Sequence, residues 1–485
     1  MNSGKKNQNL ADFDKFYFDS GNTLHYFNSF QDTLLEFNLN SSQWELDLTS
    51  VFSVLANNYI VGDNTIIKGI KRTPWLSEYN QTSITNLSIP SHGSLIMDHE
   101  EIAERFILLL KDELLHAIEK KKKIGILLSG GMDSRIVAGA LYELIKNGDI
   151  EVEAVHAFTW GEENSRDYQY AKLIAKEFKW SFNHYRTQSK DLWENILISS
   201  RRGCEYSGIH LHAMPQIGKD ALGLVEIMLA GSYGDSVGRA EFQGLHALKL
   251  RDMTHNWGRY AYLLSSAESR KHFGSYQNLI ANYRERFGKR ENWQVYEIEA
   301  QCHYMRRMLN PCMEIISENV PLYQAFTDLK FYSFVWSLDI SIRNDSIYSH
   351  VLKRLNPILS ELPWARTGIP YGKSGNPDGF QKKHHRYSEI LNLELLDQIK
   401  DSILRNEIFS NNRSLKVLFN AMKKNQSYNF DFLEKLTYLT SLSLFFENNR
   451  DRLNVSLFDN SFVDYYLTYC NYFLKTQLRA ISKRL

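Results

Sequence analysis

The chain has 485 residues, 43% of them hydrophobic, so it is long enough for roughly two or three domains around a large core. Its 57 Lys and Arg residues balance 56 Asp and Glu residues, which argues against a bulk attraction to nucleic acid or to an anionic membrane. Four scattered cysteines without a C-x-x-C pair argue against a zinc ribbon, an iron–sulfur site or a disulfide framework.

The first residues contain no apolar signal-peptide core, and no apolar run approaches membrane-spanning length, so we expect a soluble cytoplasmic protein.

The sequence pattern of the N-terminal part predicts a small unit rich in β-strands. Within residues 14–95, short segments with many aromatic residues, such as Lys15–Phe18 and Thr23–Phe27, alternate with Asn, Ser, Gly and Asp. This pattern is typical of a β-rich or α+β unit.

Between residues 98 and 230, helical and strand patterns alternate. Apolar residues recur at helical spacing over 98–119, which predicts an amphipathic helix. Short apolar runs then predict strands over 124–128, 152–159, 181–186 and 225–230. Helical patterns separate these strands, which favours an α/β fold with a doubly wound parallel sheet. Residues 240–485 are predicted to be mainly helical, apart from the turn-rich segment 367–379.

The most informative motif is S-G-G-M-D-S at residues 129–134, directly after the strand 124–128. Its serines and glycines allow a tight turn, and a helical pattern follows from Asp133. A helix N-terminus with unpaired amides suits phosphate, and an aspartate beside phosphate suits a divalent cation between them. The segment is not a Walker A loop, because no G-K-[ST] follows. The alternative interpretation is an ordinary turn with N-cap residues.

Two further loops follow other predicted strands. Trp160-Gly161 precedes the polar segment 162–167, and residues 231–236 read G-S-Y-G-D-S. Because ligands bind beyond the carboxyl ends of strands in an open α/β sheet, we expect both loops to lie near the first. Each loop taken alone is also consistent with a simple turn.

These three loops resemble the synthetase domain of glutamine-dependent asparagine synthetase and its relatives, which include β-lactam synthetases and lasso-peptide cyclases. The resemblance covers most of residues 45–370 and implies an adenine nucleotide alpha-hydrolase-like fold with ATP and Mg²⁺ as cofactors. It implies that Asp133 and Asp235 hold the metal. The nucleotide-binding residues that it implies are Ser129, Gly130, Gly131, Asp133, Ser134, Gly161 and Gly231.

The resemblance also implies an AMP-forming carbon–nitrogen ligase. A carboxylate would attack the α-phosphate of ATP, pyrophosphate would leave, and an amine or ammonia would then displace AMP. The implied partners are a small-molecule or peptide carboxylate and an amine donor, without nucleic acid or membrane. A homodimer and a separate amidotransferase that supplies ammonia both stay open.

Several residues depart from the family pattern. Asn2 stands where the family's glutaminase domain has its catalytic cysteine, and the N-terminal unit is shorter than that domain. We therefore expect an inactive glutaminase-like region at 1–97, a synthetase domain at 98–385 and a helical extension at 386–485. In the third loop, Ser232 replaces an acid that helps deprotonate the amine, while Asp235 is retained as a catalytic candidate.

The family's flap lysine is also missing. The nearest cations, Arg366 and Lys373, lie in the glycine-rich segment 366–375 and are our catalytic candidates for contact with the α-phosphate under a closed lid. The segment is equally consistent with a surface loop whose cations are solvated.

Residues 205–212 are expected near the substrate. Glu205 and Tyr206 are candidates for substrate contact, whereas His210 and His212 are interpreted as pocket-wall residues rather than a metal site. Three functions remain as alternatives: a tailoring ligase for another carboxylate, a tRNA-modifying or sulfur-transfer enzyme with this loop, and an inactive nucleotide-binding relative. The lack of a cysteine pair and of a basic stripe argues against the second.

Overall fold

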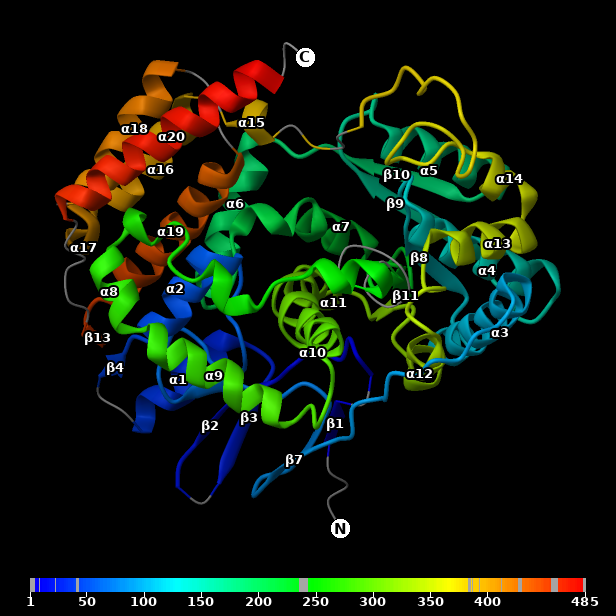
Figure 1. Cartoon of the computed structure of the whole chain (residues 1–485), viewed down its shortest axis with the longest axis horizontal. Coiled ribbons are helices and arrows are strands. Elements are labelled where there is room, and N and C mark those ends of the chain that lie inside the picture. The colour runs from blue at the N-terminus through cyan, green and yellow to red at the C-terminus, as the bar shows by residue number, and fades with distance from the viewer. Residues whose placement is uncertain are drawn as a thin grey trace.

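The computed structural model shows an α/β half built on a parallel sheet and a second half in which the N-terminal unit and the C-terminal helices pack together (Figure 1). No helix in the described part of the chain combines the length and hydropathy needed to cross a membrane. The structure describes residues 5–7, 9–21, 23–40, 43–234, 243–382, 385, 387–391, 393–410, 412–425, 430–454 and 461–482.

The N-terminal unit has the α+β composition that its sequence pattern predicts. One antiparallel sheet has the order β3-β2-β5 and the other β1-β6-β7. The strands are β1 (Lys5–Asn7), β2 (Phe16–Asp19), β3 (Leu24–Phe27), β5 (Ile70–Arg72), β6 (Ser77–Tyr79) and β7 (Ile84–Asn86). The helices are α1 (Phe30–Asn40) and α2 (Leu48–Asn57), and Asp47 caps α2 by accepting from the Thr49 amide at 3.0 Å.

The C-terminal helices pack against the N-terminal unit. One hydrophobic cluster joins Val51 and Leu55 of α2 to residues of the central helix α19, such as Leu436 and Leu439. In addition, β4 (Trp44–Glu45) pairs in parallel with β13 (Leu453–Asn454). The helices of this layer are α15 (Tyr387–Ile390), α16 (Leu393–Arg405), α17 (Glu407–Ser410), α18 (Arg413–Asn425), α19 (Phe430–Asn448) and α20 (Phe462–Ser482). The predicted domain boundaries at residues 97 and 385 stay a prediction.

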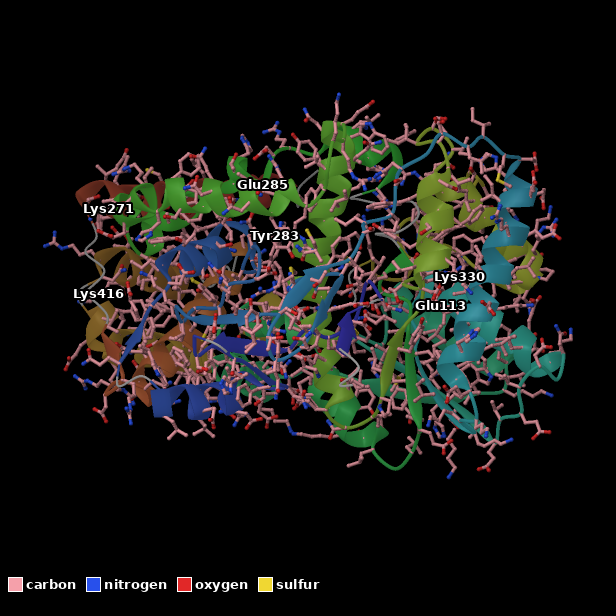
Figure 2. All side chains as sticks on the ribbon, turned by 90° about the horizontal axis from the view of Figure 1, so that it is seen from below. Glu113, Lys271, Tyr283, Glu285, Lys330 and Lys416 are labelled. Atoms are coloured by element: carbon pink, nitrogen blue, oxygen red, sulfur yellow. The ribbon has the colours of Figure 1, made fainter. Side chains whose placement is uncertain are left out.

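A π-helix, η6 (Ala300–Leu309), lies between α10 (Asn292–Glu299) and α11 (Asn310–Ser317) and ties the N-terminal unit to the sheet half. Its buried Arg306 donates to Asp14 and to Asp63, each at 2.7 Å. Tyr283 of α9 (Phe273–Glu285), labelled in Figure 2, donates its hydroxyl to Asp63 at 3.1 Å. Buried charged hydrogen bonds of this kind fix the orientation of η6. The short helix α8 (Ser266–Lys271) precedes α9.

The parallel sheet has the strand order β10-β9-β8-β11-β12. Because the chain moves to one side of β8 for β9 and β10 and then to the other side for β11 and β12, the sheet is doubly wound, which confirms the predicted fold class. The three residues of β12 are too few for a strand pattern, so the sequence did not predict it. The strands are β8 (Lys123–Leu127), β9 (Ala154–Trp160), β10 (Ser181–Tyr185), β11 (Ile227–Ala230) and β12 (Leu322–Gln324).

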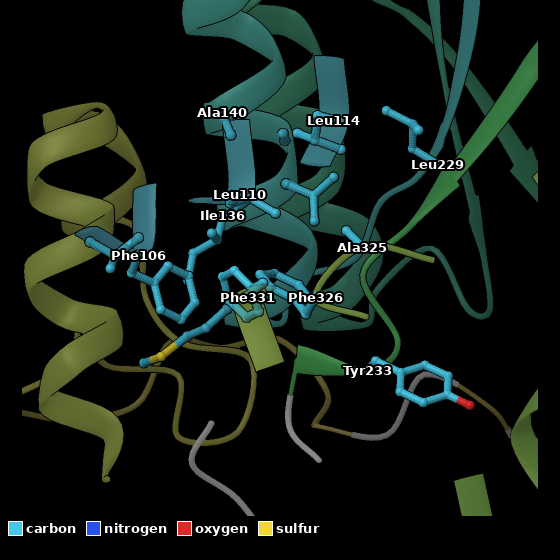
Figure 3. Close-up of a cluster of buried hydrophobic side chains, with 14 of the residues drawn as sticks. Phe106, Leu110, Leu114, Ile136, Ala140, Leu229, Tyr233, Ala325, Phe326 and Phe331 are labelled. Atoms are coloured by element: carbon cyan, nitrogen blue, oxygen red, sulfur yellow. The ribbon is translucent and has the colours of Figure 1, made fainter. Parts of the chain in front are cut away.

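A dense apolar core lies between this sheet and its helices (Figure 3). Phe106, Leu110 and Leu114 recur every four residues on α3 and meet Ile136 and Ala140 of α4. Each fully buried large apolar side chain contributes about 1.5–3 kcal/mol, so this packing holds the sheet edge rigid. The helices of this half are α3 (His99–Ile118), α4 (Met132–Lys146), α5 (Arg166–Glu177), α6 (Ser189–Arg201), α7 (Met214–Ala221), α12 (Leu329–Ser337), α13 (Asp345–Leu355) and α14 (Pro357–Glu361).

Candidate active site

The loop 129–134 joins β8 to α4, and its own hydroxyl groups hold its shape. Ser134 Oγ accepts from the Ser129 amide at 3.1 Å and lies 3.0 Å from Ser129 Oγ. Ser129 Oγ in turn accepts from the Gly131 amide at 3.1 Å. Gly131 precedes the first residue of α4 and has no side chain to cap the helix, so the amides of the first turn are left to water or to an anion.

A pocket of about 330 Å³ opens at the carboxyl ends of β8, β9 and β11. Ser129, Gly131, Asp133 and Ser134 of the first loop line it. Gly231 and Ser232 of the third loop lie on the same pocket. The structure therefore brings together five of the seven predicted nucleotide-binding residues, as expected for loops that leave neighbouring parallel strands at one edge.

Gly130 and Gly161 are not among the lining residues. Gly130 is buried behind the loop, and its amide donates to Asp167 Oδ1 at 3.0 Å. A Cβ at Gly130 would lie 2.8 Å from the Tyr170 ring and 2.9 Å from the Arg166 carbonyl oxygen, so only glycine fits there. Gly161 takes φ +116° just after β9, a conformation that favours glycine.

The third loop packs directly against Asp133. A Cβ at Gly231 would lie 3.1 Å from the Asp133 carbonyl oxygen, and a Cβ at Gly234 would overlap the Asp133 carboxylate. The Tyr348 hydroxyl donates to the Gly234 carbonyl at 2.9 Å, which holds this loop in place. The next residue, Asp235, lies outside the described residues.

The residues around Asp133 suit a Mg²⁺ ion that is held jointly by the protein and by a bound phosphate. They do not suit a cation that is held by protein side chains alone. In the described part of the chain, no three His, Cys, Asp or Glu side chains gather into a metal cage. Mg²⁺ is commonly bound by one or two carboxylates together with the phosphates of its substrate. Asp133 offers one carboxylate on the pocket at the start of α4, where those phosphates would lie.

His210 and His212 form part of the pocket wall, in agreement with their interpretation from the sequence. His210 Nε2 lies 2.6 Å from Glu434 Oε1. Burial alone would raise the pKa of Glu434, but the neighbouring imidazole of His210 holds that pKa below its usual value. His212 Nδ1 lies 2.5 Å from the Tyr387 hydroxyl, and its backbone has φ +47°. Such strain is common at functional sites.

The expectation that Glu205 and Tyr206 contact a substrate is not supported. Both are fully buried and absent from the pocket lining. Glu205 lies between Arg72, at 2.7 Å, and Arg307, at 3.0 Å. Burial would raise the pKa of Glu205, but these guanidinium groups hold it below its usual value. Its role is therefore to connect the N-terminal unit to η6.

The flap, residues 362–382, is anchored close to the first loop by residues that the sequence reasoning missed. Arg166 donates to Asp378 at 2.8 Å, and the Tyr170 hydroxyl donates to the same carboxylate. The Arg166 amide also donates to the Gln381 carbonyl at 2.9 Å, which gives the flap a strand-like contact at the start of α5. Arg166 belongs to the polar segment 162–167 that follows the second predicted strand, but Asp378 and Gln381 carry no signal in the sequence.

The predicted catalytic cations lie on the outer part of this flap. Arg366 and Lys373 are exposed and do not line the pocket. The Arg366 guanidinium lies 5.5 Å from the centre of the Trp364 ring. Their action at an α-phosphate therefore stays a prediction that requires the flap to move.

The sheet topology and the loop after β8 define an α/β protein with a doubly wound parallel sheet and a glycine-rich loop at its carboxyl edge. Residues 109–311 match the asparagine synthase family model. A protein of Methanocaldococcus jannaschii described as "Putative asparagine synthetase (glutamine-hydrolyzing) 2" is 27% identical over 147 residues. That match spans 29% of this chain and 27% of the relative, so the chain covers about a quarter of the relative's length.

Solved structures with some similarity come from other enzymes. A U34-tRNA thiolase from Methanococcus maripaludis is 15% identical with a TM-score of 0.21, covering 57% of this chain and 85% of that one. An NH3-dependent NAD synthetase from Campylobacter jejuni is 14% identical with a TM-score of 0.21, covering 46% and 93%. An NMN synthetase from Francisella tularensis has the same identity and score, covering 50% and 94%.

Proposed function

We propose that this protein is an AMP-forming carbon–nitrogen ligase that uses ATP and Mg²⁺ to adenylate a carboxylate and then transfers the acyl group to an amine or to ammonia. The observation that carries this proposal is the loop 129–134, which sits at the head of α4 and opens into a pocket at the carboxyl edge of the sheet. The asparagine synthase match over residues 109–311 supports the same class of reaction.

The residues of the pocket have distinct roles in this proposal. The hydroxyl groups of Ser129 and Ser134 and the first amides of α4 bind the pyrophosphate that leaves. Asp133 holds Mg²⁺, which offsets the phosphate charge when ATP is bound. Positioning and charge stabilisation then supply most of the rate, because no covalent intermediate with the protein is needed. We propose Asp235 as a second metal ligand and catalytic residue from the sequence motif alone.

The flap has a second role in the proposal. An acyl-adenylate reacts readily with water, so the enzyme must exclude water while the amine enters. The flap, residues 362–382, is anchored beside the first loop and is placed to cover it when it moves. We propose that Arg366 or Lys373 then contacts the α-phosphate, in place of the lysine that the family has in its flap.

The test is ATP–pyrophosphate exchange by the purified protein across a panel of carboxylic acids. Exchange that requires both an acid and Mg²⁺ is the expected result, and AMP should appear when an amine is added. Binding of ATP without exchange for any acid would instead indicate an inactive nucleotide-binding relative. ADP formation would contradict the AMP-forming reaction.

A further inference from the structure

The pocket wall formed by η6 and α11 is apolar and rich in sulfur. Tyr304, Met308, Leu309, Cys312 and Met313 contribute to this wall. It adjoins the third loop, because Ser232 Oγ lies 3.8 Å from Met313 Sδ. Apolar carbon and thioether groups bind other apolar groups and offer no counter-charge to an ion.

The rest of the described lining adds little charge. Among the lining residues that the structure describes, there is no Lys or Arg, and Asp133 is the one carboxylate. Asp133 is the proposed metal ligand. The two imidazoles are already engaged, His210 by Glu434 and His212 by Tyr387. A substrate with an ammonium and a second carboxylate would therefore find no counter-charge for either group among the described lining residues.

The strand order indicates which side of the pocket receives the acyl group. The phosphate loop follows β8, which has β9 on one side and β11 on the other. On the β9 side, Trp160 contributes an aromatic ring to the pocket lining, which suits a base, so the nucleotide is assigned to that side of the loop. The acyl group, which must reach the α-phosphate, then occupies the other side of the pocket. That side faces β11 and is formed by the η6–α11 wall.

Resting on the proposed function, we infer that the carboxylate substrate has an uncharged, predominantly apolar acyl group, aliphatic or aromatic, and is not an acidic amino acid. Burial of an unpaired charge disfavours binding, whereas burial of each methylene favours it. These two effects act in the same direction. The buried ion pairs of Arg306 and Arg307 hold η6, so the wall cannot readily turn a charged side chain toward the substrate.

The first test compares acids of matched length. We expect hexanoate and 3-phenylpropanoate to support ATP–pyrophosphate exchange with kcat/KM at least tenfold above that for adipate, aspartate or glutamate. The inference is overturned if a dicarboxylic or zwitterionic acid is preferred. Calorimetric binding of the same acids, with Mg²⁺ and a non-hydrolysable ATP analogue, separates the two proposals. Hexanoate binding without exchange would overturn the proposed function alone, and absence of hexanoate binding would overturn the inference.

The second test places a charge in the wall. Met308→Lys should lower kcat/KM for hexanoate at least tenfold and raise it for adipate, because the ammonium pairs with the second carboxylate. Met308→Leu should keep the preference for apolar acids. Met97→Lys is the matched control, because Met97 is a partly buried methionine like Met308 but lies outside the pocket. If Met308→Lys folds, by its thermal transition, and keeps the original preference, the wall does not contact the acyl group.

Discussion

The Arg135 guanidinium donates a hydrogen bond of 2.8 Å to the carbonyl oxygen of Gly130, so a buried cation lies directly behind the proposed phosphate loop. The same side chain donates to backbone carbonyls at the start of the flap, including that of Leu362 at 3.1 Å. Burial lowers the pKa of Arg135 to about 10. One side chain thus connects the loop and the flap.

Removing this connection should loosen the flap. Arg135→Met leaves several buried carbonyls without a donor, which costs about 1–3 kcal/mol for each group left unsatisfied. We expect a lower urea midpoint and faster proteolytic cleavage within 364–382. Arg135→Lys should show a smaller effect, because the ammonium can satisfy only some of these carbonyls. Equal cleavage rates for the Arg135→Met variant and the wild type would show that Arg135 does not restrain the flap.

Asp133→Asn tests the metal-binding role of the loop. The amide keeps the shape of the side chain but loses the charge, so pyrophosphate exchange should fall by about 10² or more. Removal of Mg²⁺ with a chelator should have the same effect on the wild type. Asp133→Asn should keep the thermal transition of the wild type. Full exchange in this variant would contradict the assignment, and Asp235→Asn provides the same test for the third loop.

The flap cations have a separate test. Arg366→Ala and Lys373→Ala should be compared in single-turnover adenylation, because product release does not affect that measurement. A cation that contacts the α-phosphate under a closed flap should cost about 10² or more in rate. Both side chains are exposed, so neither change should alter stability. A loss of less than about threefold in both variants would identify them as solvated surface cations.

The purified chain should not hydrolyse glutamine. Asn2 stands where the family has its nucleophilic cysteine. Burial raises the pKa of the Cys312 thiol to about 12 and those of Cys204 and Cys302 well above the usual value, which disfavours a thiolate at each. Glutamate release from glutamine is the measurement, with free ammonium as the positive control for amide formation. Robust glutamate release would require another nucleophile.

Glu113 should make stability depend on pH. It lies buried on α3 (labelled in Figure 2), and its Oε1 accepts from the amides of Thr327 and Asp328 at 2.9 and 3.0 Å. Burial raises its pKa from 4.5 to about 7. Between these values the folded protein holds a proton that the unfolded chain has lost. The free energy of unfolding should therefore fall, by up to about 1.4 kcal/mol per pH unit, as pH rises from 4.5 to 7.

Glu113→Gln provides the control for this prediction. The amide cannot titrate, so the difference in unfolding free energy between the variant and the wild type should change across this pH range. Urea unfolding at pH 5 and pH 7 measures that difference. If the difference in unfolding free energy is the same at both pH values, Glu113 is ionised in the folded protein. The backbone amides that donate to its carboxylate would then stabilise the charge.

Local sequence patterns alone were enough to predict the strands around the site and the turn that carries the proposed phosphate loop. The apolar runs at 124–128 and 225–230 predicted β8 and β11, because a strand buried on both faces needs a continuous apolar segment. The motif at 129–134 was readable because its glycines, hydroxyl groups and helix start are local features. Their mutual contacts span five residues or fewer.

The roles of Gly130, Glu205 and the flap depend on contacts that form only in the folded chain. Gly130 turned from a predicted phosphate contact into a close-packing residue whose amide binds Asp167. Glu205 became a partner of Arg72 and Arg307 rather than of a substrate. The physical reason is that each of these contacts joins segments far apart in the chain. Whether a charged side chain meets a counter-charge, a backbone carbonyl or a pocket depends on packing that no local pattern specifies.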